Sequence, residues 1–187
     1  MKGIIFSLLE DVVTDDFGAD TWDDVVEDAQ VAGAYSAIGS YHDHDFVRLL
    51  SALPVSASEG TGERLRWFGE RAMPLLAARY PVFFSPHTSM TTFLPTLNDV
   101  IHPEVRKLYP GAEVPVFEVS HPVADGVDLT YRSHRGLCAL AEGFVVGAAG
   151  VFGQRAAVHQ TRCTLTGASE CLIVCRFTAR GDLRVPA

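Results

Sequence analysis

The chain has 187 residues, with 48% hydrophobic and 20% charged side chains and a formal net charge of −8 at pH 7. This composition is typical of one globular domain and unlike that of a disordered chain. The acidic balance argues against nucleic acid as a partner, since phosphate backbones are bound by basic surfaces. No apolar run reaches the ~18 residues of a membrane span, and Glu10 and Asp11 end the N-terminal apolar stretch early. We therefore expect a cytoplasmic protein that binds neither nucleic acid nor membrane.

Residues 1–110 carry apolar side chains at helical spacing and predict a mainly helical part of the fold. FGADTW and the small-residue stretch VSASEGTG interrupt this pattern. Thr21 followed by Asp24 resembles a capping box, which predicts that a helix opens at Thr21. Pro95 and Pro103 punctuate the last helix of this part. The expected helices cover residues 4–13, 21–29, 43 or 44 to 50, 63–79 and 93–108.

Residues 111–187 have a different pattern of apolar and polar side chains, which predicts a sheet with one helix. VPVFEVSHP and VDLTYRS are typical of two strands joined by the turn ADG, and residues 155–164 and 171–177 predict two more, joined at TGAS. Between the pairs, residues 137–152 are apolar almost all round, with Glu142 the one charge, as in a buried helix. We expect an α+β fold over residues 1–187: a helical N-terminal part and a four-stranded antiparallel sheet with a packed helix.

His102 stands in LNDVIHPEV, on a predicted helix beside an apolar stripe. Pro103 has no N–H and crowds the carbonyl of Asp99, which therefore loses its helical partner. That carbonyl, or the Asp99 side chain, can accept from Nδ1–H of His102 and leave Nε2 free to bind a metal. The alternative is an ordinary hydrogen-bonded histidine at a helix kink.

The stretch YRSHR predicts a carboxylate-binding set, because alternation in a strand puts Tyr131, Ser133 and Arg135 on one face and Arg132 and His134 on the other. A phenol, a hydroxyl and a guanidinium are hydrogen-bond donors that suit carboxylates. A solvated strand face with an incidental ion pair is the alternative. An axial histidine, this donor set and an almost wholly apolar helix directly after it are together what a buried haem requires.

The chain resembles the H-NOX (haem nitric oxide/oxygen-binding) family, the sensor domain also found in soluble guanylate cyclases, and in particular its standalone bacterial type with a C-terminal zinc site. The resemblance rests on motifs in the family's order over nearly the whole chain: MKGII, FGADTW, NDVIH, VPVFEV and YxSxR. It implies haem b buried between the helical part and the sheet. It assigns the iron ligand to His102, the propionates to Tyr131, Ser133 and Arg135, haem distortion to Pro115, and the distal side to Ile5.

The resemblance also implies a gas selectivity. Oxygen-binding members carry a distal tyrosine on the helix after YxSxR, where this chain has Leu140 with Phe144 nearby. An apolar pocket predicts binding of NO and CO with O₂ disfavoured, unless Tyr35, Tyr41 or Tyr80 reaches in. In the family NO weakens the iron–histidine bond, and the change regulates a signalling protein. Since the chain ends soon after its last strand, we expect a separate partner, such as a histidine kinase or a cyclic-di-GMP enzyme, and no catalysis.

Two alternatives from other classes remain open at this point. One is a haem enzyme with peroxidase-like chemistry, although the apolar helix at residues 137–152 offers no distal acid–base pair. The other is a haem-free module that binds a small ligand and is stabilised by zinc.

The C-terminal cysteines predict a metal site of a different kind. His159, Cys163, Cys171 and Cys175 form H-x3-C-x7-C-x3-C, a set that suits structural zinc. In an ideal hairpin His159 and Cys175 would lie ~13 Å from the other two, so either a bulge gathers them or His159 is not a ligand. The cysteines are therefore favoured over His159, with buried thiols in a sheet as the alternative. Cys138 is expected in the core, and in YHDHD the acids suit a helix N-terminus better than a metal.

Overall fold

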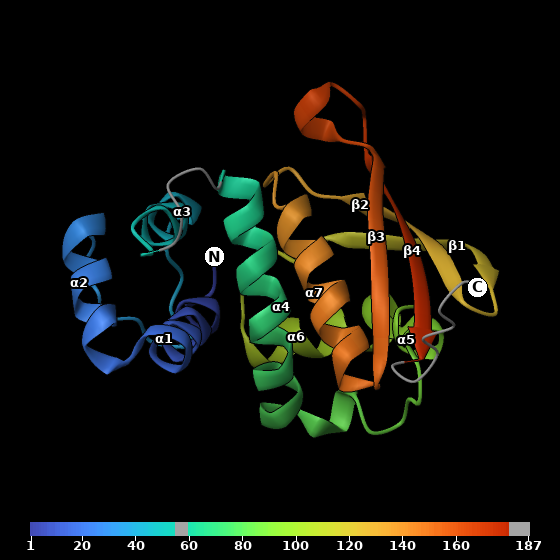
Figure 1. The fold of residues 1–187 in the computed structure, drawn as a ribbon, viewed down its shortest axis with the longest axis horizontal. Helices are drawn as coiled ribbons and strands as arrows, with labels where there is room; N and C mark the ends of the chain where they lie inside the picture. The colour runs from blue at the N-terminus through green and yellow to red at the C-terminus, as the bar shows by residue number, and fades with distance from the viewer. Residues whose placement is uncertain (55–59, 180–187) are drawn as a thin grey trace, which may run out of the picture.

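A computed structural model describes residues 1–54 and 60–179, so most of the predicted loop at residues 55–62 lies outside the described part. The fold is α+β, with helices at the N-terminal side and an antiparallel sheet at the other, as the sequence predicts. Two helices, α4 and α7, stand between these layers (Figure 1). None of the described helices is long and apolar enough to span a bilayer.

The elements follow one another from mainly helical to mainly strand. The helices are α1 (Gly3–Phe17), α2 (Ala19–Ala29), α3 (Asp43–Ser51), α4 (Thr61–Arg79), η1 (Pro81–Phe83), α5 (Met90–Phe93), η2 (Leu97–Ile101), α6 (His102–Leu108), α7 (Cys138–Val151) and η3 (Thr164–Thr166). The strands are β1 (Val116–Val123), β2 (Gly126–Arg132), β3 (Gln154–Arg162) and β4 (Cys171–Ala179).

The sheet has the strand order β1-β2-β4-β3, and every neighbouring pair is antiparallel. Tyr131 in β2 is paired with Cys171 at the start of β4. Strand β3 is irregular near its end, where Gln160 pairs with Ile173 and Arg162, two residues on, already pairs with Leu172. This β-bulge reverses the alternation of faces beyond it, which matters for the cysteines below.

Helices α4 and α7 approach so closely that glycine is required at their crossing. A Cβ on Gly143 would lie 2.3 Å from the carbonyl oxygen of Arg66, and one on Gly147 would lie 2.4 Å from that of Glu70. Glu142 on α7, the one charge of the apolar helix, is buried and forms an ion pair with the Arg66 side chain. The crossing therefore joins the two layers through α7, which also packs on the sheet.

The core consists of two clusters of buried apolar side chains. One joins α1, α2, α3 and α4, with Phe6, Phe46 and Phe68 among its largest members. The other joins α5, α7 and the sheet, with Met90 and Ile173 fully buried. The junction between the two clusters leaves room for a cavity.

Two predicted helices are wrong in detail. The helix expected at residues 93–108 is instead a series of short segments, because Pro95 and Pro103 interrupt the hydrogen-bond ladder. Within it η2 is a π-helical turn, and the His102 N–H donates to the carbonyl of Leu97, five residues earlier. Helix α2 begins before Thr21, whose hydroxyl donates to the carbonyl of Phe17 and forms no capping box.

Candidate functional site

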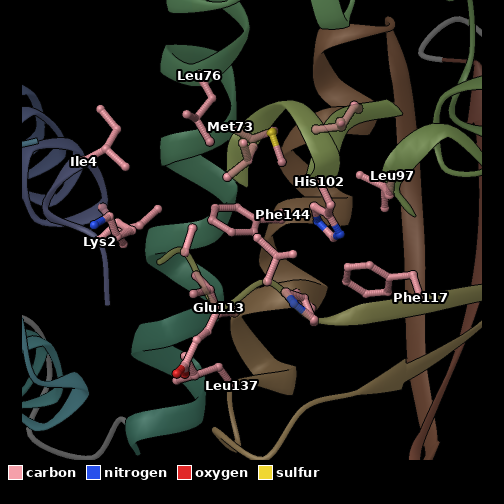
Figure 2. A pocket seen from close by; sticks show the side chains of 18 of the residues that line it. Lys2, Ile4, Met73, Leu76, Leu97, His102, Glu113, Phe117, Leu137 and Phe144 are labelled. Atoms are coloured by element: carbon pink, nitrogen blue, oxygen red, sulfur yellow. The ribbon is translucent and has the colours of Figure 1, made fainter. Parts of the chain in front are cut away.

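A cavity of about 490 Å³ lies between the two core clusters, and its walls are mostly apolar. Figure 2 shows the His102 imidazole directed into it between Phe144 and Phe117, with Met73 and Leu76 on the wall formed by α4. Of the predicted site residues, the cavity brings together Ile5, His102, Pro115, Tyr131, Ser133, Arg135, Leu140 and Phe144. The volume is in the range of pockets that enclose cofactors and other small organic ligands.

His102 is the first residue of α6, and its imidazole lies on the wall of the cavity. Burial, and next the positive charge of Arg106, lower the pKa of His102 to about 4, while a backbone hydrogen bond to Pro115 acts the other way. The predicted hydrogen bond from Nδ1 to Asp99 is not formed: Nδ1 is buried and has no hydrogen-bond partner in the described residues. The ring is therefore neutral and has an unused nitrogen, the state in which histidine binds a metal.

Asn98, in the same NDVIH motif, positions this segment. The Phe117 N–H donates to Oδ1 of Asn98 at 3.1 Å, and Nδ2 of Asn98 donates to the Phe117 carbonyl. The pair joins η2 to the start of β1, next to Pro115. Sequence reasoning missed this role. The only available signal was the side chain itself, since an amide both donates and accepts and can therefore pair with the N–H and C=O of a strand residue.

The polar end of the cavity is formed by three residues of YRSHR, namely Tyr131, Ser133 and Arg135. Tyr131 is the second-last residue of β2 and only 3% exposed, and Ser133 and Arg135 follow in the turn after the strand. Burial raises the pKa of Tyr131, which a hydrogen bond with Ser133 partly offsets. Arg132 points away and donates to Glu118 at 3.0 Å and Glu170 at 2.9 Å. The cluster is thus divided by face, even though the strand ends earlier than predicted.

Arg135 also joins this end of the cavity to the N-terminal helices. Its Nε and Nη2 donate to the two carboxylate oxygens of Asp43, each at 2.6 Å, and Nη1 donates to the Glu113 carbonyl at 3.1 Å. The N-terminal amine of Met1 lies 2.9 Å from the same carboxylate. Burial would raise the pKa of Asp43, but the hydrogen bonds from Arg135 and the amine outweigh it and lower the pKa. A guanidinium has five N–H donors, so Arg135 retains donors for a ligand.

The family model described as "Haem-NO-binding" matches residues 2–160. The chain belongs to this family, the H-NOX proteins. Its members are haem gas-binding domains and are generally non-catalytic. The chain has no significant match among curated proteins.

Solved H-NOX structures share the whole fold. The H-NOX protein from S. oneidensis in the Fe(II)NO state is 28% identical, with a TM-score of 0.86, over 95% of this chain and 99% of that one. The H-NOX domain from the same organism in the Fe(II)CO state is also 28% identical over 95% and 99%, with a TM-score of 0.84. The unliganded Fe(II) H-NOX protein from K. algicida is 26% identical over 95% and 97%, with a TM-score of 0.81.

In this H-NOX chain tyrosines do reach the cavity wall. Tyr41, Tyr80 and Tyr109 line it, whereas Tyr35 stacks on Phe6 with ring centroids 4.2 Å apart. The Tyr41 hydroxyl accepts from the Ser36 N–H at 2.8 Å, and the hydroxyls of Tyr80 and Tyr109 are hydrogen-bonded to each other. Burial and then this bond raise the pKa of Tyr109 to about 12. The two hydroxyl groups of that pair are thus held by each other.

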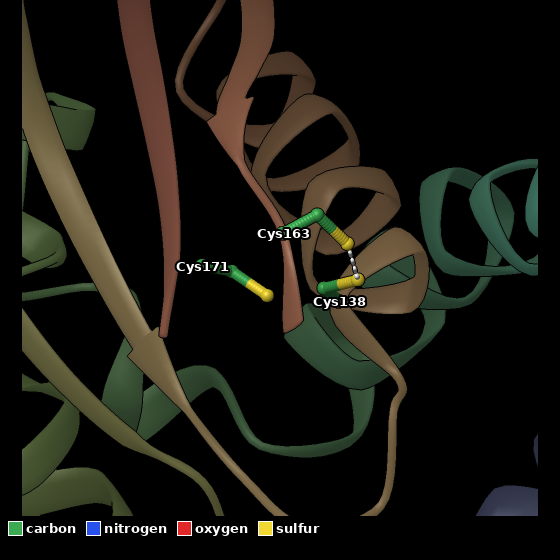
Figure 3. Close-up of side chains that lie close together, drawn as sticks. All are labelled: Cys138, Cys163 and Cys171. Atoms are coloured by element: carbon green, nitrogen blue, oxygen red, sulfur yellow. Dashed lines mark hydrogen bonds between the residues drawn. The ribbon is translucent and has the colours of Figure 1, made fainter. Parts of the chain in front are cut away.

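The cysteines gather at the N-terminal end of α7, in a set that differs from the predicted one. The Sγ atoms of Cys138, Cys163 and Cys171 lie within 4.8 Å of one another, and those of Cys138 and Cys163 are 3.8 Å apart. Figure 3 shows the Cys171 side chain pointing toward this pair. Cys138, expected in the core, joins the cluster, and His159 and Cys175 do not.

Strand geometry explains the correction. His159 lies on the exposed face of β3, opposite in direction to its neighbours Val158 and Gln160. Cys175 pairs with Val158, four residues along β4 from Cys171, and burial raises the pKa of its thiol to about 12. It is a core thiol. Among the described residues, the three clustered cysteines are the one group of His, Cys, Asp or Glu close enough to bind a metal together, so YHDHD forms none.

The cluster fits a soft metal ion by its donor set. Burial would raise the pKa of Cys163, but backbone N–H groups after it and hydrogen bonds with Cys138 and Cys171 lower the pKa. The N–H of Thr164 donates to the Cys171 sulfur at 3.3 Å. Such N–H···S bonds favour thiolates, which are the form in which cysteine binds zinc.

Proposed function

We propose that the protein is a haem-based sensor of NO whose iron ligand is His102. The observation that carries this proposal is the buried neutral imidazole of His102, with a nitrogen that has no hydrogen-bond partner among the described residues, on the wall of an apolar cavity. A buried polar atom without a partner costs free energy, which a coordination bond would offset. Haem b, when bound, supplies an iron atom with one open position for a gas molecule.

The polar end of the cavity suits the propionates of haem. Tyr131, Ser133 and Arg135 all line it, and the Arg135 side chain is only 14% exposed. We assign these three side chains to the propionates, with Arg135 held in place by Asp43. Pro115, adjacent to the His102 wall, is assigned to contact and distort the porphyrin.

The apolar wall supports NO selectivity. Ile5, Leu140 and Phe144 offer no hydrogen-bond donor, and bound O₂ needs one more than NO or CO does. The tyrosines that line the cavity hold protein partners through their hydroxyls. We therefore propose that NO and CO bind and that O₂ is disfavoured.

Absorption spectra of the reduced protein under argon, O₂, CO and NO test this assignment. We expect a Soret band that shifts under CO and NO and stays unchanged under O₂. A stable ferrous–oxy spectrum in air would refute the selectivity, and a colourless protein after haem reconstitution would refute the haem assignment. The S. oneidensis structures in the Fe(II)NO and Fe(II)CO states make these two gases the natural comparison.

We further propose that release of His102 when NO binds frees α6 and shifts the helical layer relative to the sheet. His102 begins α6 directly after the irregular π-turn of η2, so the helix is joined to the core through a weakly regular segment. Such a shift regulates a separate protein, for which a histidine kinase or a cyclic-di-GMP enzyme is proposed by family analogy. His102→Gly with added imidazole should mimic the released state; an effect on the partner equal to that of unliganded protein would refute the switch.

We also propose that Zn²⁺ binds the cluster of Cys138, Cys163 and Cys171. Three thiols from α7, the end of β3 and the start of β4 meet there, so an ion would join three elements. Elemental analysis of the reduced protein should give one zinc per chain, lost in Cys171→Ser and kept in Cys175→Ala. Equal zinc content in both variants would refute the assignment.

A further inference from the structure

The cysteine cluster supplies three ligand atoms, whereas structural zinc takes four. Among the described residues, no fourth Cys, His, Asp or Glu offers an atom within the same 4.8 Å group. Two of the thiols, Cys138 and Cys171, are buried, while Cys163 is half-buried. The cluster therefore reaches solvent on the side of Cys163.

The Thr164 hydroxyl lies 3.4 Å from the Cys171 sulfur, and Gln160 is a second polar side chain at the cluster. It lies on the inner face of β3 with Val158, and its side chain lies against the Cys138 thiol. Its Nε2 atom is buried, and among the described residues it has no hydrogen-bond partner other than the Cys138 thiol that it lies against. The bulge between Gln160 and Arg162 is what turns both Gln160 and Cys163 inward, since an odd separation of three residues would otherwise place them on opposite faces.

An amide is a poor substitute for a fourth ligand. Its NH₂ group only donates hydrogen bonds, and its oxygen is not among the donors that zinc takes in structural sites. A buried NH₂ group has two N–H donors, however, so it can donate one to a thiolate and the other to an oxygen bound to the ion. Three protein ligands with a water or substrate molecule in the fourth position is the arrangement of catalytic zinc sites, where that fourth ligand exchanges.

We propose that zinc at this cluster has three thiolate ligands and an exchangeable fourth ligand from outside the protein, which accepts a hydrogen bond from Gln160. The inference rests on the zinc site proposed above and deepens it. The fourth position takes water, and small donors such as a free thiol or an imidazole replace it. The site is then open to exchange, in contrast to a closed four-ligand structural site.

X-ray absorption at the zinc edge tests the proposal. The haem-loaded protein can be used, because the iron of haem does not absorb at the zinc edge energy in a way that obscures the zinc signal. The wild-type chain should show three sulfur atoms and one oxygen or nitrogen around zinc. Excess imidazole should add the multiple-scattering pattern of an imidazole ring, and excess of a small thiol should give four sulfur atoms. Both changes are measured without any partner or gas ligand.

Gln160→His provides the matched variant, since it places an imidazole at the position that the amide faces. Its zinc should show three sulfurs and an imidazole without any addition, should not respond to added imidazole, and should be released to a chelator at least ~10-fold more slowly. His159→Ala, one residue away on the exposed face, should behave like the wild type. If Gln160→His does not fold, the imidazole titration of the wild type still decides.

The outcomes separate this inference from the zinc assignment. Four protein ligands in the untreated wild type, seen as four sulfurs or as an imidazole, would overturn the open position and leave the zinc site standing. An unchanged spectrum with added imidazole and thiol would also overturn it. Absence of zinc from the reduced protein would refute the zinc site, and the inference with it.

Discussion

The haem cavity and the cysteine cluster differ in how the fold builds them. The cavity takes side chains from both core clusters and from most helices, and Tyr131, Ser133 and Arg135 lie together on one part of its wall. The cluster takes three thiols from three backbone segments that meet at one point. Binding of a large apolar ligand therefore depends on many weak contacts and one strong bond. Binding of a small ion depends on the strand register that brings its ligands together. Single substitutions should therefore act gradually on the cavity wall and abruptly at the cluster.

The two sites are nevertheless joined by a short loop. Tyr131 pairs with Cys171, and Cys138 begins α7 three residues after Arg135. Both ends of the loop that carries Ser133 and Arg135 are therefore next to a cysteine of the cluster. An ion at the cluster would hold the loop that we assign to the propionates.

The largest effect on the cavity should come from His102→Ala. Loss of the proposed bond between His102 and the haem iron should weaken haem binding by at least about 3 kcal/mol, or roughly 100-fold, and change the Soret band. Haem transfer to an apo-haem acceptor measures this. His134→Ala, with a side chain that is 80% exposed, is the control and should leave binding unchanged. A retained five-coordinate histidine spectrum in His102→Ala would contradict the assignment.

Zinc removal should have the next largest effect and tests whether the two sites are coupled. At free zinc of about 100 times Kd, the ion should stabilise the fold by about 2–3 kcal/mol. We expect chelation to lower the thermal midpoint and also to accelerate haem loss, because the loop of Ser133 and Arg135 loses its anchor. Cys175→Ala, in the same strand, should keep both responses. Haem loss that is insensitive to chelation would show that the two sites are independent.

Much of the cavity could be predicted from sequence because its signals are local. Alternation in β2 separates Tyr131 from Arg132, and the apolar run at residues 137–152 predicts α7. The residues that contact this site from distant parts of the sequence gave no such local signal. Asp43 meets Arg135 from 92 residues away, and it was interpreted only as a helix N-terminal acid. The π-turn before His102 depends on hydrogen bonds five residues apart that proline alone does not predict.

The cysteine cluster was predicted only in part. One extra residue in β3, the bulge between Gln160 and Arg162, reverses which side chains point inward beyond it. Regular alternation cannot bring His159 and Cys163 to one ion, and the sequence left a bulge as one solution. The bulge exists, but it lies beyond His159, which stays on the exposed face, and it brings Cys163 to the inner face with Gln160. Cys138 was missed because an apolar helix made its thiol look like core, and only the packing of α7 on the sheet brings it to Cys163. Neither the packing of α7 on the sheet nor the bulge in β3 can be predicted from the pattern of apolar and polar residues.

Asp43→Asn should have a moderate effect and tests the link between the cavity and the N-terminal helices. Loss of the charged bonds with Arg135 and the N-terminal amine should cost about 1–2 kcal/mol of unfolding free energy at pH 7. The pKa of Asp43 is below 3.8 in the folded protein, so this stabilisation is present above that pH and lost as the pH falls through the lowered value. Denaturation of both proteins at pH 7 and pH 3 measures it.

Asp45→Asn is the matched control for that comparison, because it removes a carboxylate from the same first turn of α3 outside the Arg135 network. It should cost less, and its effect reports the interaction with the helix dipole together with that between Asp45 and Tyr35. Equal losses in the two variants would mean that the bonds of Asp43 with Arg135 add no stability of their own.

The smallest effect should come from Tyr80→Phe, which separates the tyrosines on the cavity wall from gas selectivity. The substitution removes the bond between the hydroxyls of Tyr80 and Tyr109, and water can replace it at these half-buried groups, so the cost should be about 0.5–1 kcal/mol. The pKa of Tyr109, about 12 in the wild type, should fall part of the way toward 10, since burial remains; ultraviolet titration of the phenol measures this. Tyr109→Phe should give the same loss of stability.

In both variants the spectra under O₂, CO and NO should match those of the wild type, because Ile5, Leu140 and Phe144 leave the gas molecule without a donor. A change in O₂ binding would place a phenol in the gas pocket and make the polar pair, not the apolar wall, the source of selectivity.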